Sequence, residues 1–562
     1  MEEQLKCFIN NDCLICEDSH LFSQLINTFD LDIIHFKQAH SFIPKIIVTE
    51  REPVRFLAAF LAACRANCPV FLCNPDWGKQ EWLQVFDLIK PDIIWGVVEA
   101  SYSLDNSYSL ENNFYSLENN SCSLNNSTNK KAGKMSTLQI DNPNTNSLLP
   151  IPNSPLPITN SPFSHIMIPT GGSSGKIKFA VHTWDTLTAS VRGFQEYFQV
   201  DKINAFCVLP LYHVSGLMQF IRCFLTGGKL VILPFKTLET GEADDNDIKN
   251  LINGVTESGY EFKFREIGVK HIYSNSSSRT NKFNISTQEC LINHLNFFIS
   301  LVPTQLERLL QKSDLIQWLS KFKTVLLGGA PAWNELLEKA RFHHIRLAPT
   351  YGMTETASQI ATLKPDDFLK GKVGCGKVLP HAKVQIVNEK GEVLKFNQVG
   401  KINIKTESLA LGYYPLNGEI QTYLQIDDLA FLDKQSYLNI VGRNSDKIIT
   451  GGEKVYPAEV EAAIRATGMV TDVCVIGLFD THWGQVVTAI YVPSNSTIFN
   501  ENIKALLQEK LSNYKIPKFW ISVDSLPRNS QGKINRQKLY EIAAFTELSI
   551  QTKISRYKKT NI

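Results

Sequence analysis

The chain has 562 residues, of which 43% are hydrophobic and 20% are charged, and its formal net charge is +2. This length exceeds what one core supports, so two or more domains are expected. The near-neutral charge excludes a general affinity for nucleic acid or anionic membranes. The twelve cysteines include one C-x-x-C pair, Cys13 and Cys16. We interpret the cysteines as reduced thiols rather than as disulfides or metal ligands.

The N-terminal segment MEEQLKCFIN is acidic and lacks the basic start and apolar run of a signal peptide. The longest apolar run, residues 56–64, is about half the length of a membrane span. These features predict a cytoplasmic protein without a membrane span.

Strands and helices alternate from the start of the chain. Residues 45–50 and 69–75 read as strands, and between them a helix over 53–65 has proline in its first turn. Residues 91–98 read as another strand. Residues 101–163 follow as a repetitive stretch rich in Asn, Ser, Thr and Pro. Because this composition buries little apolar surface, we expect a disordered insertion there.

The alternation resumes after the insertion. Further strands are expected at 165–170, 205–211, 229–234, 297–303, 323–329 and 345–352, with helices at 183–198, 217–225, from 304, and at 333–342. This pattern predicts a mostly parallel α/β sheet. Residues 240–285 read as a second, polar insertion. From about residue 443 the pattern restarts as a small α+β unit, with helices at 459–466 and 502–511 and strands at 472–478 and 486–492.

The segment IPTGGSSGKIKF, residues 168–179, forms a loop rich in Gly and Ser followed by two lysines. Backbone N–H groups in such a loop suit phosphate oxygens. The pair Gly175-Lys176 suggests a Walker loop, but Thr170 stands at the first glycine position and Ile177 at the hydroxyl position. The sequence therefore predicts a phosphate loop of another kind, with a plain surface turn as the alternative.

Four further segments carry candidate chemistry. YGMTET, residues 351–356, offers an aromatic ring, hydroxyls and the Glu355 carboxylate, an oxygen donor suited to Mg²⁺. LLGGAP, residues 326–331, ends a strand with small residues. Asp428 and Arg443 follow fifteen residues apart, and Lys533 stands in a polar loop. Taken singly, these segments also fit a turn, a strand end, a surface ion pair and a solvated lysine.

In this order, the segments resemble the acyl-adenylate-forming (AMP-binding) superfamily of acyl-CoA ligases, adenylation domains and luciferases. The resemblance implies an α/β fold with a large multi-sheet N-terminal domain over 1–442, a hinge at 443–445 and a small mobile α+β lid over 446–562. It also implies ATP, Mg²⁺ and coenzyme A, and a small-molecule carboxylic acid as substrate. The oligomeric state stays open, with a homo-oligomer permitted.

The resemblance assigns roles residue by residue. The nucleotide phosphates would lie against Thr170, Gly171, Gly172, Ser173, Ser174, Gly175 and Lys178. The adenine would contact Gly329, Ala330, Pro331, Tyr351 and Gly352, and the ribose would contact Asp428 and Arg443. Thr354 and Glu355 would bind the phosphate and Mg²⁺, and Lys533 would be the catalytic lysine. The chain departs from the family pattern at Ile177, at Ile426-Asp427 and at Ser445.

The implied chemistry has two steps. The acid attacks the α-phosphate of ATP, giving an acyl-adenylate and pyrophosphate, and positioned cations stabilise the developing charge. The small domain then rotates, so that Lys533 leaves and residues 450–453, with Gly451 and Gly452, line the approach of the thiol. Because no carrier-protein motif follows, the thiol is expected to be coenzyme A.

The segments LPLYHVSGL, residues 209–217, and SLVPTQLERLL, residues 300–310, resemble the o-succinylbenzoate–CoA ligases of menaquinone and phylloquinone synthesis. This resemblance places His213, Ser215, Gly216 and Thr304 around the acid, with His213 among the catalytic groups. The alternatives are a ligase for another aryl or medium-chain acid and an inactive nucleotide-binding module. For His213 alone, the alternative is a core histidine.

Overall fold

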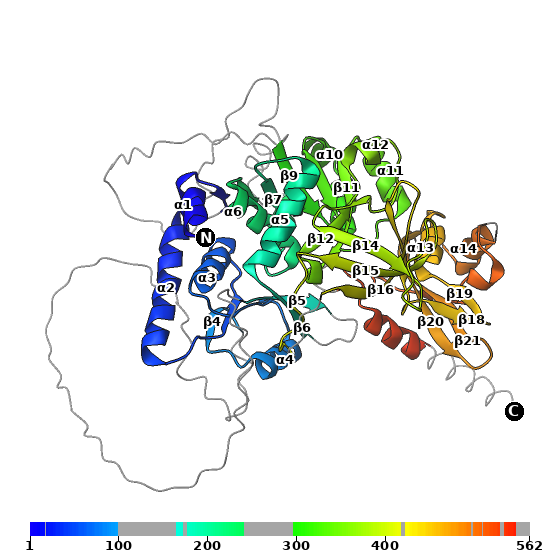
Figure 1. The fold of residues 1–562 in the computed structure, drawn as a ribbon. Helices are drawn as coiled ribbons and strands as arrows, with labels where there is room; N and C mark the ends of the chain where they lie inside the picture. Colours follow the sequence, from blue (N-terminus) through cyan, green and yellow to red (C-terminus); the bar gives the residue numbers. More distant parts are fainter. Residues whose placement is uncertain are drawn as a thin grey trace, which may run out of the picture.

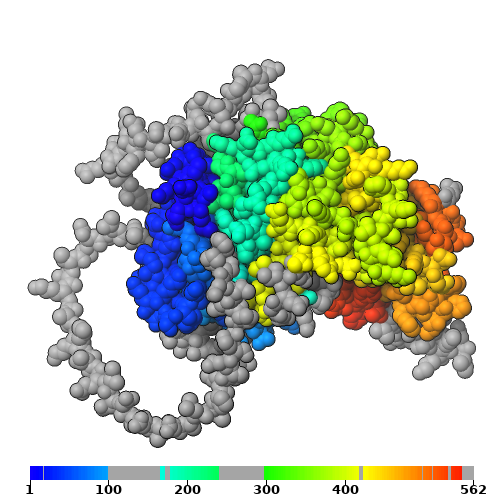
Figure 2. Space-filling model, in the orientation of Figure 1, coloured from blue at the N-terminus to red at the C-terminus, as the bar shows by residue number. Residues whose placement is uncertain are grey.

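The computed structural model describes residues 1–16, 18–98, 165–171, 177–240, 296–416, 422–495, 498–508, 510–528 and 533–546. Apart from residue 240, both predicted insertions lie outside these residues, as do residues 172–176 of the Gly/Ser loop. The large domain contains three sheets, and the small domain forms one end of the molecule, coloured orange to red in Figures 1 and 2.

The largest sheet has eight strands and is mostly parallel, as predicted. In spatial order they are β1 (Leu14–Ile15), β8 (Leu230–Ile232), β7 (Asn204–Cys207), β9 (Phe297–Leu301), β10 (Thr324–Leu327), β11 (Leu347–Met353), β12 (Ser358–Thr362) and β13 (Lys377–Val378). The pairing is parallel from β1 to β11, whereas β12 and β13 are antiparallel. Loops that follow β9, β10 and β11 therefore leave from one edge, the usual place of a ligand site in such sheets.

The second sheet has the order β4 (Ile93–Gly96), β2 (Ile46–Thr49), β3 (Val70–Leu72), β5 (Ile166–Gly171) and β6 (Ile177–His182). Its strands are parallel except for the β5–β6 hairpin, which carries the Gly/Ser loop. The third sheet is wholly antiparallel, with β14 (Ala382–Val387), β15 (Gly400–Thr406), β16 (Leu424–Leu432) and β17 (Leu438–Arg443) in that order. The sequence analysis placed no individual strands in this third sheet.

The helices of the large domain pack on and between the sheets. They are α1 (Glu2–Asn10), α2 (Phe22–Ala39), α3 (Pro53–Arg65), α4 (Lys79–Ile89), α5 (Trp184–Phe198), α6 (Val214–Thr226), α7 (Phe235–Thr240), α9 (Pro303–Leu309), α10 (Ser313–Ser320), α11 (Asn334–Phe342) and α12 (Pro365–Leu369). Residues 56–63 of α3 are at most 1% exposed, and α2 packs along this helix (Figure 1). The longest apolar run is thus a core helix, and within the described ranges no helix is long and apolar enough to cross a bilayer.

The small domain is built on one sheet, in the order β19 (Glu453–Val455), β18 (Ile448–Thr450), β21 (Gly484–Pro493) and β20 (Val470–Asp480), with β22 (Phe519–Ser522) paired to β21. Helices α13 (Pro457–Arg465) and α14 (Asn500–Leu507) contribute to its own core of Val, Ile and Leu. The first strand of this α+β unit, β18, begins at Ile448.

Candidate functional site

Three residues predicted to contact the nucleoside lie together. The Tyr351 hydroxyl donates a hydrogen bond to Asp428 Oδ2 over 2.5 Å, and Arg443 Nε donates to Asp428 Oδ1 over 3.2 Å. Asp428 and Arg443 are direct partners across β16 and β17, so the sheet fixes this pair. Burial, followed by the Asp428 charge, raises the pKa of Tyr351, which therefore stays a neutral donor.

Tyr413 joins two more predicted groups, although the sequence analysis did not select it. Its hydroxyl donates to Glu355 Oε1 over 2.5 Å, and the Lys178 ammonium lies 5.3 Å from the centre of its ring. Burial and then the Glu355 charge raise the pKa of Tyr413. Because Tyr413 bridges to Ala180 on β6, it places the Glu355 carboxylate close to the hairpin that carries the Gly/Ser loop.

The hairpin itself is continuous up to the loop. Thr170 pairs with Lys178 and Gly171 pairs with Ile177 in antiparallel register. The predicted phosphate-loop residues Gly172, Ser173, Ser174 and Gly175 lie outside the described residues. The strand ends that flank this loop therefore lie near Glu355, and its role as a phosphate loop stays a prediction.

Lys533 reaches this cluster from the small domain. Its pKa is lowered, first by loss of solvation and second by Arg443, while Glu355 and Asp428 oppose the shift. The residue keeps an exposed surface, so solvent screens part of these interactions. Lys533 also acts on His213, whose pKa falls to about 3 mainly through burial. The predicted catalytic lysine is thus within electrostatic reach of four other predicted site residues, His213, Glu355, Asp428 and Arg443.

His213 begins α6 as its N-cap residue and is 8% exposed. Gly216, in the first turn, packs so closely on the preceding loop that a Cβ would lie 2.2 Å from the carbonyl oxygen of Pro210. This contact alone requires glycine there. Ser215 lies between them, and its carbonyl accepts a hydrogen bond from Gln219 one turn on.

Arg222 is a buried cation that the sequence analysis missed. It is 2% exposed and lies on α6, nine residues after His213. Its Nη2 donates to Ser358 Oγ over 3.2 Å and to Gln359 Oε1 over 3.3 Å, and its guanidinium lies 4.3 Å from the Phe194 ring centre. Burial lowers the pKa of Arg222 to about 10. In the described part of the chain its Nε has no hydrogen-bond partner, so this cation has spare donor capacity.

Two other predicted groups are exposed, one after a strand and one on a strand. Gly329, Ala330 and Pro331 follow β10 and are exposed, and Gly329 has a φ of +81°. Gly352 is exposed on β11, where a Cβ would lie 2.1 Å from the Ser358 carbonyl oxygen. The β11–β12 pairing therefore also accounts for this glycine.

The predicted thiol-side loop is the turn between β18 and β19. Gly451 and Gly452 have φ angles of +58° and +85°, which favour glycine, and Gly451 N donates to the Trp483 carbonyl over 2.9 Å. Trp483 belongs to the small domain, so the turn is held by its own domain in this conformation.

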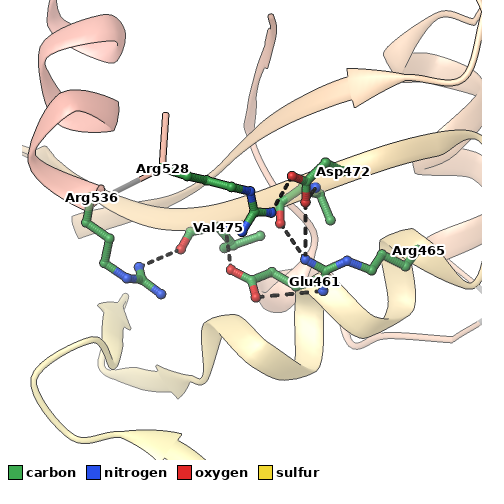
Figure 3. A network of polar contacts seen from close by, with 7 residues as sticks. Glu461, Arg465, Asp472, Val475, Arg528 and Arg536 are labelled. Atoms are coloured by element: carbon green, nitrogen blue, oxygen red, sulfur yellow. Dashed lines mark hydrogen bonds and ion pairs between the residues drawn. The ribbon is translucent and has the colours of Figure 1, made fainter. Parts of the chain in front are cut away.

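A cavity of about 160 Å³ lies between the two domains. The large domain contributes Thr304, Glu307, Arg308 and Trp333, and the small domain contributes Arg465, Thr471, Asp472 and Arg528. Figure 3 shows Arg465 and Arg528 converging on the Asp472 carboxylate, with Glu461 beside them. Thr304, predicted to line the acid pocket, lines this interdomain cavity.

Known protein families match both domains. Residues 45–249 and 277–414 match the AMP-binding enzyme model, and residues 459–533 match the model of the AMP-binding enzyme C-terminal domain. The chain belongs to the AMP-binding enzyme family. The resemblance inferred from the sequence, including the two-domain α/β fold, is confirmed.

Similar curated proteins of the AMP-binding family include the 2-succinylbenzoate–CoA ligase of Listeria monocytogenes serovar 1/2a, 32% identical over 381 residues, or 66% of this chain and 68% of the relative. The enzyme of that name from Bacillus velezensis is 36% identical over 268 residues, or 46% of this chain and 54% of the relative. Among solved structures, o-succinylbenzoate CoA synthetase from Bacillus subtilis, in complex with its acyl-adenylate, superposes with a TM-score of 0.66 at 21% identity. The match covers 95% of this chain and 97% of that one.

Another solved structure, ATP-bound MatB from Rhodopseudomonas palustris, gives a TM-score of 0.65 at 19% identity and covers 92% of each chain. At these identities, both structural matches show the AMP-binding fold and nothing finer.

The donor set of this AMP-binding chain fits magnesium. In the residues described, no group of three or more His, Cys, Asp or Glu side chains converges as a metal site. A Mg²⁺ ion bound mainly through substrate phosphates needs only one or two protein ligands, which Glu355 and Thr354 can supply. The chemistry of the donors is thus consistent with a magnesium–nucleotide complex rather than with a protein metal cage.

Proposed function

We propose that this chain is an AMP-forming acid–CoA ligase that converts 2-succinylbenzoate, ATP and CoA to 2-succinylbenzoyl-CoA, AMP and diphosphate, in menaquinone or phylloquinone synthesis. The observation that carries the choice of acid is Arg222, a buried cation with spare donor capacity on the helix that His213 begins. The curated relatives at 30% identity and above with this substrate in their names support the same choice.

In the first step, a carboxylate oxygen of the acid attacks the α-phosphorus of ATP, and the bond from that phosphorus to the bridging β-oxygen breaks. Diphosphate leaves and the acyl-adenylate remains. Negative charge moves onto the phosphate oxygens, so nearby cations stabilise the transition state. Lys533 and Lys178 are the cations that we assign to this work, while Asp428 and Arg443 hold the ribose and Tyr351 lies against the adenine.

Bound Mg²⁺ would neutralise phosphate charge and orient the nucleotide, with Glu355 and Thr354 as its protein ligands. The Tyr413 hydroxyl holds one Glu355 oxygen, which leaves the second oxygen available to the metal.

In the second step, the CoA thiol attacks the acyl carbonyl, AMP leaves and the thiol proton is released. We propose that the small domain rotates about residues 443–445 between the steps, bringing Gly451 and Gly452 toward the thiol path. We assign the described conformation, in which Lys533 interacts with Glu355 and Asp428, to the first step.

The second carboxylate of 2-succinylbenzoate is the feature that this site is suited to recognise. Desolvated cations bind anions far more strongly than exposed ones do, and polar groups left unpaired reject an uncharged analogue. Arg222 would supply the charge for the second carboxylate, and we assign His213 and Ser215, at the other end of α6, to contacts with another part of the acid. Thr304 lines the interdomain cavity, so we assign it only an indirect role in binding the acid.

A CoA-ligation assay with a panel of acids tests this proposal. We expect kcat/KM for 2-succinylbenzoate to exceed that for benzoate, 4-phenylbutyrate and octanoate by about 100-fold or more. A better rate with octanoate or another aryl acid would leave the ligase class intact and overturn the substrate. If no acid supports ATP–pyrophosphate exchange, the chain is an inactive nucleotide-binding module. The cytoplasmic location and a homo-oligomer stay predictions.

A further inference from the structure

The segment that carries Thr354 and Glu355 is held through four consecutive backbone carbonyls. The carbonyl oxygens of residues 354–357 accept hydrogen bonds from His182 Nε2 (2.7 Å), Ala410 N (2.8 Å), Ser408 Oγ (2.9 Å) and Ser190 Oγ (2.7 Å). These donors come from β6, from the chain after β15, and from α5. Four fixed donors on neighbouring elements therefore determine where this short segment lies.

The segment needs such support because its backbone is strained. Ala357 and Ser358 have φ angles of +49° and +92°, a region that residues other than glycine seldom occupy. Strain of this kind persists only where surrounding contacts over-determine the conformation, and it is concentrated at functional sites.

The His182 hydrogen bonds define its protonation state. Its Nδ1 lies 2.9 Å from Thr186 Oγ1 and its Nε2 lies 2.7 Å from the Thr354 carbonyl oxygen. A carbonyl only accepts, so Nε2 carries the proton. Complete burial lowers the pKa of His182 to about 4, so the ring is neutral and Nδ1 accepts from the Thr186 hydroxyl. Thr186 thus orients the ring, and the ring donates to Thr354.

His182 also connects the two segments assigned to the nucleotide phosphates. It ends β6, the strand that carries Lys178, and it lies on the same hairpin as Thr170. The hydrogen bond to Thr354 spans 172 residues of sequence and ties this hairpin to the Glu355 segment. A shift of either segment would change the distance between Lys178 and Glu355.

We propose that His182 is a positioning residue for magnesium–ATP, which sets the Thr354 hydroxyl and the Glu355 carboxylate relative to Thr170 and Lys178 on the β5–β6 hairpin by holding the Thr354 carbonyl. This role rests on the proposed adenylation chemistry. His182 itself touches no substrate atom in this role and acts through Thr354.

The test compares His182→Gln, His182→Leu and the control His165→Gln in the full-length chain. A glutamine amide N–H can replace the donor to Thr354, whereas leucine cannot. His165 is a partly buried histidine whose pKa burial also lowers, and it precedes β5 at the end opposite the Gly/Ser loop. Three quantities are measured: the Kd of magnesium–ATP without acid, the Mg²⁺ dependence of ATP–pyrophosphate exchange, and thioester formation from supplied 2-succinylbenzoyl-adenylate and CoA.

We expect His182→Leu to raise the Kd of magnesium–ATP and the Mg²⁺ concentration for half-maximal exchange by about 10-fold or more. His182→Gln should restore much of this loss, and thioester formation should stay within about twofold. Three results would overturn the proposal. The first is a loss of magnesium–ATP binding that only parallels a fall in melting temperature. The others are an equal loss in both half-reactions and an equal effect of His165→Gln. If the wild type binds magnesium–ATP but uses no 2-succinylbenzoate, the proposed function fails while the Kd comparison still tests His182.

Discussion

The guanidinium carbon of Arg465, in the small domain, lies 5.6 Å from the centre of the Trp333 ring, in the large domain. Arg465 is oriented by its own domain, because its Nη2 donates to the Val473 carbonyl over 2.7 Å and lies 3.8 Å from Asp472. The cation–π contact therefore costs little side-chain entropy when the domains dock. It favours the conformation that brings Lys533 to Glu355 and Asp428.

Replacing Trp333 with leucine should weaken this docked conformation selectively. A partly exposed cation–π contact contributes about 0.5–1 kcal/mol, which corresponds to a fall in pyrophosphate exchange of roughly two- to fivefold. Thioester formation from supplied acyl-adenylate should be unchanged or faster, because we propose that this step uses the rotated arrangement of the small domain. Single-turnover rates of the two half-reactions provide the measurement.

Phe342→Leu is the matched control, since Phe342 is 78% exposed near the other end of α11. It should leave both rates unchanged. Equal reduction of the two half-reactions in Trp333→Leu would show that the ring supports the large domain rather than its docking.

Lys533→Ala should separate the two half-reactions most strongly. If Lys533 stabilises the charge that develops during adenylation, ATP–pyrophosphate exchange should fall by about 100- to 1000-fold. Thioester formation from supplied acyl-adenylate should largely survive, because in the proposed rotation the lysine leaves the site before that step. Comparable losses in both would remove Lys533 from the role assigned here.

The Asp427 carboxylate accepts hydrogen bonds from two residues of the predicted hinge. Its Oδ2 accepts from Ser445 N over 2.7 Å and its Oδ1 accepts from Asn444 Nδ2 over 3.3 Å. Burial opposes ionisation, but the hydrogen bonds from Ser445 and Asn444 leave the pKa of Asp427 below its usual range. The sequence analysis noted Asp427 and Ser445 as separate departures from the family pattern, whereas the structure joins them in one contact.

Ser445→Pro should keep adenylation and lose CoA transfer, because proline fixes φ near −65° and prevents the rotation. It also removes the Ser445 N–H, which donates a hydrogen bond to Asp427. Ser445→Ala retains both the N–H and the free φ, so it should turn over close to the wild-type rate. Normal overall turnover in Ser445→Pro, measured as acyl-CoA formed from acid, ATP and CoA, would place the pivot elsewhere.

Local sequence predicted the helices and strands of the parallel sheets well, whereas the assigned nucleotide contacts stay predictions. The helix over 53–65 matches α3 (Pro53–Arg65) because its apolar run and proline are local signals. Tyr413, Arg222 and His182 were missed because their partners lie 58, 137 and 172 residues away. No periodicity encodes such pairings. The one local signal was Arg222 itself, the only charged residue of the mostly apolar helix α6.

The buried histidines predict how stability depends on pH. Burial lowers the pKa of His182 and of His381 to about 4 and that of His213 to about 3, against an ordinary value of 6.5. Between these values and 6.5 the unfolded chain binds more protons than the folded one. The free energy of unfolding should therefore rise with pH from about 4 to 6.5, by up to 1.4 kcal/mol per pH unit for each histidine, and then level off.

Denaturant midpoints at pH 4.5, 5.5, 6.5 and 7.5 check this dependence. His182→Gln should flatten the slope relative to the wild type, since one of the depressed groups is removed. A midpoint that is constant over this range, or that falls as the pH rises, would contradict the assigned histidine environments.

Arg222→Met tests the recognition of the acid. Methionine keeps much of the buried volume but removes the cation, so a second carboxylate on the substrate loses its partner. We expect the KM for 2-succinylbenzoate to rise by about 10- to 100-fold, while the KM for ATP changes little. The ratio of kcat/KM for 2-succinylbenzoate over 4-phenylbutyrate should fall by a similar factor, because the second acid lacks that carboxylate.

His213→Ala is the companion variant. It should also raise the KM for 2-succinylbenzoate more than the KM for ATP, but with a smaller effect on the ratio between the two acids, since the imidazole is neutral at pH 7. If Arg222 only supports Ser358 and Gln359, Arg222→Met will lower the rates with both acids equally. That outcome would remove the charge-based reason for choosing a dicarboxylate, because the neutral groups that remain do not distinguish one carboxylate from two.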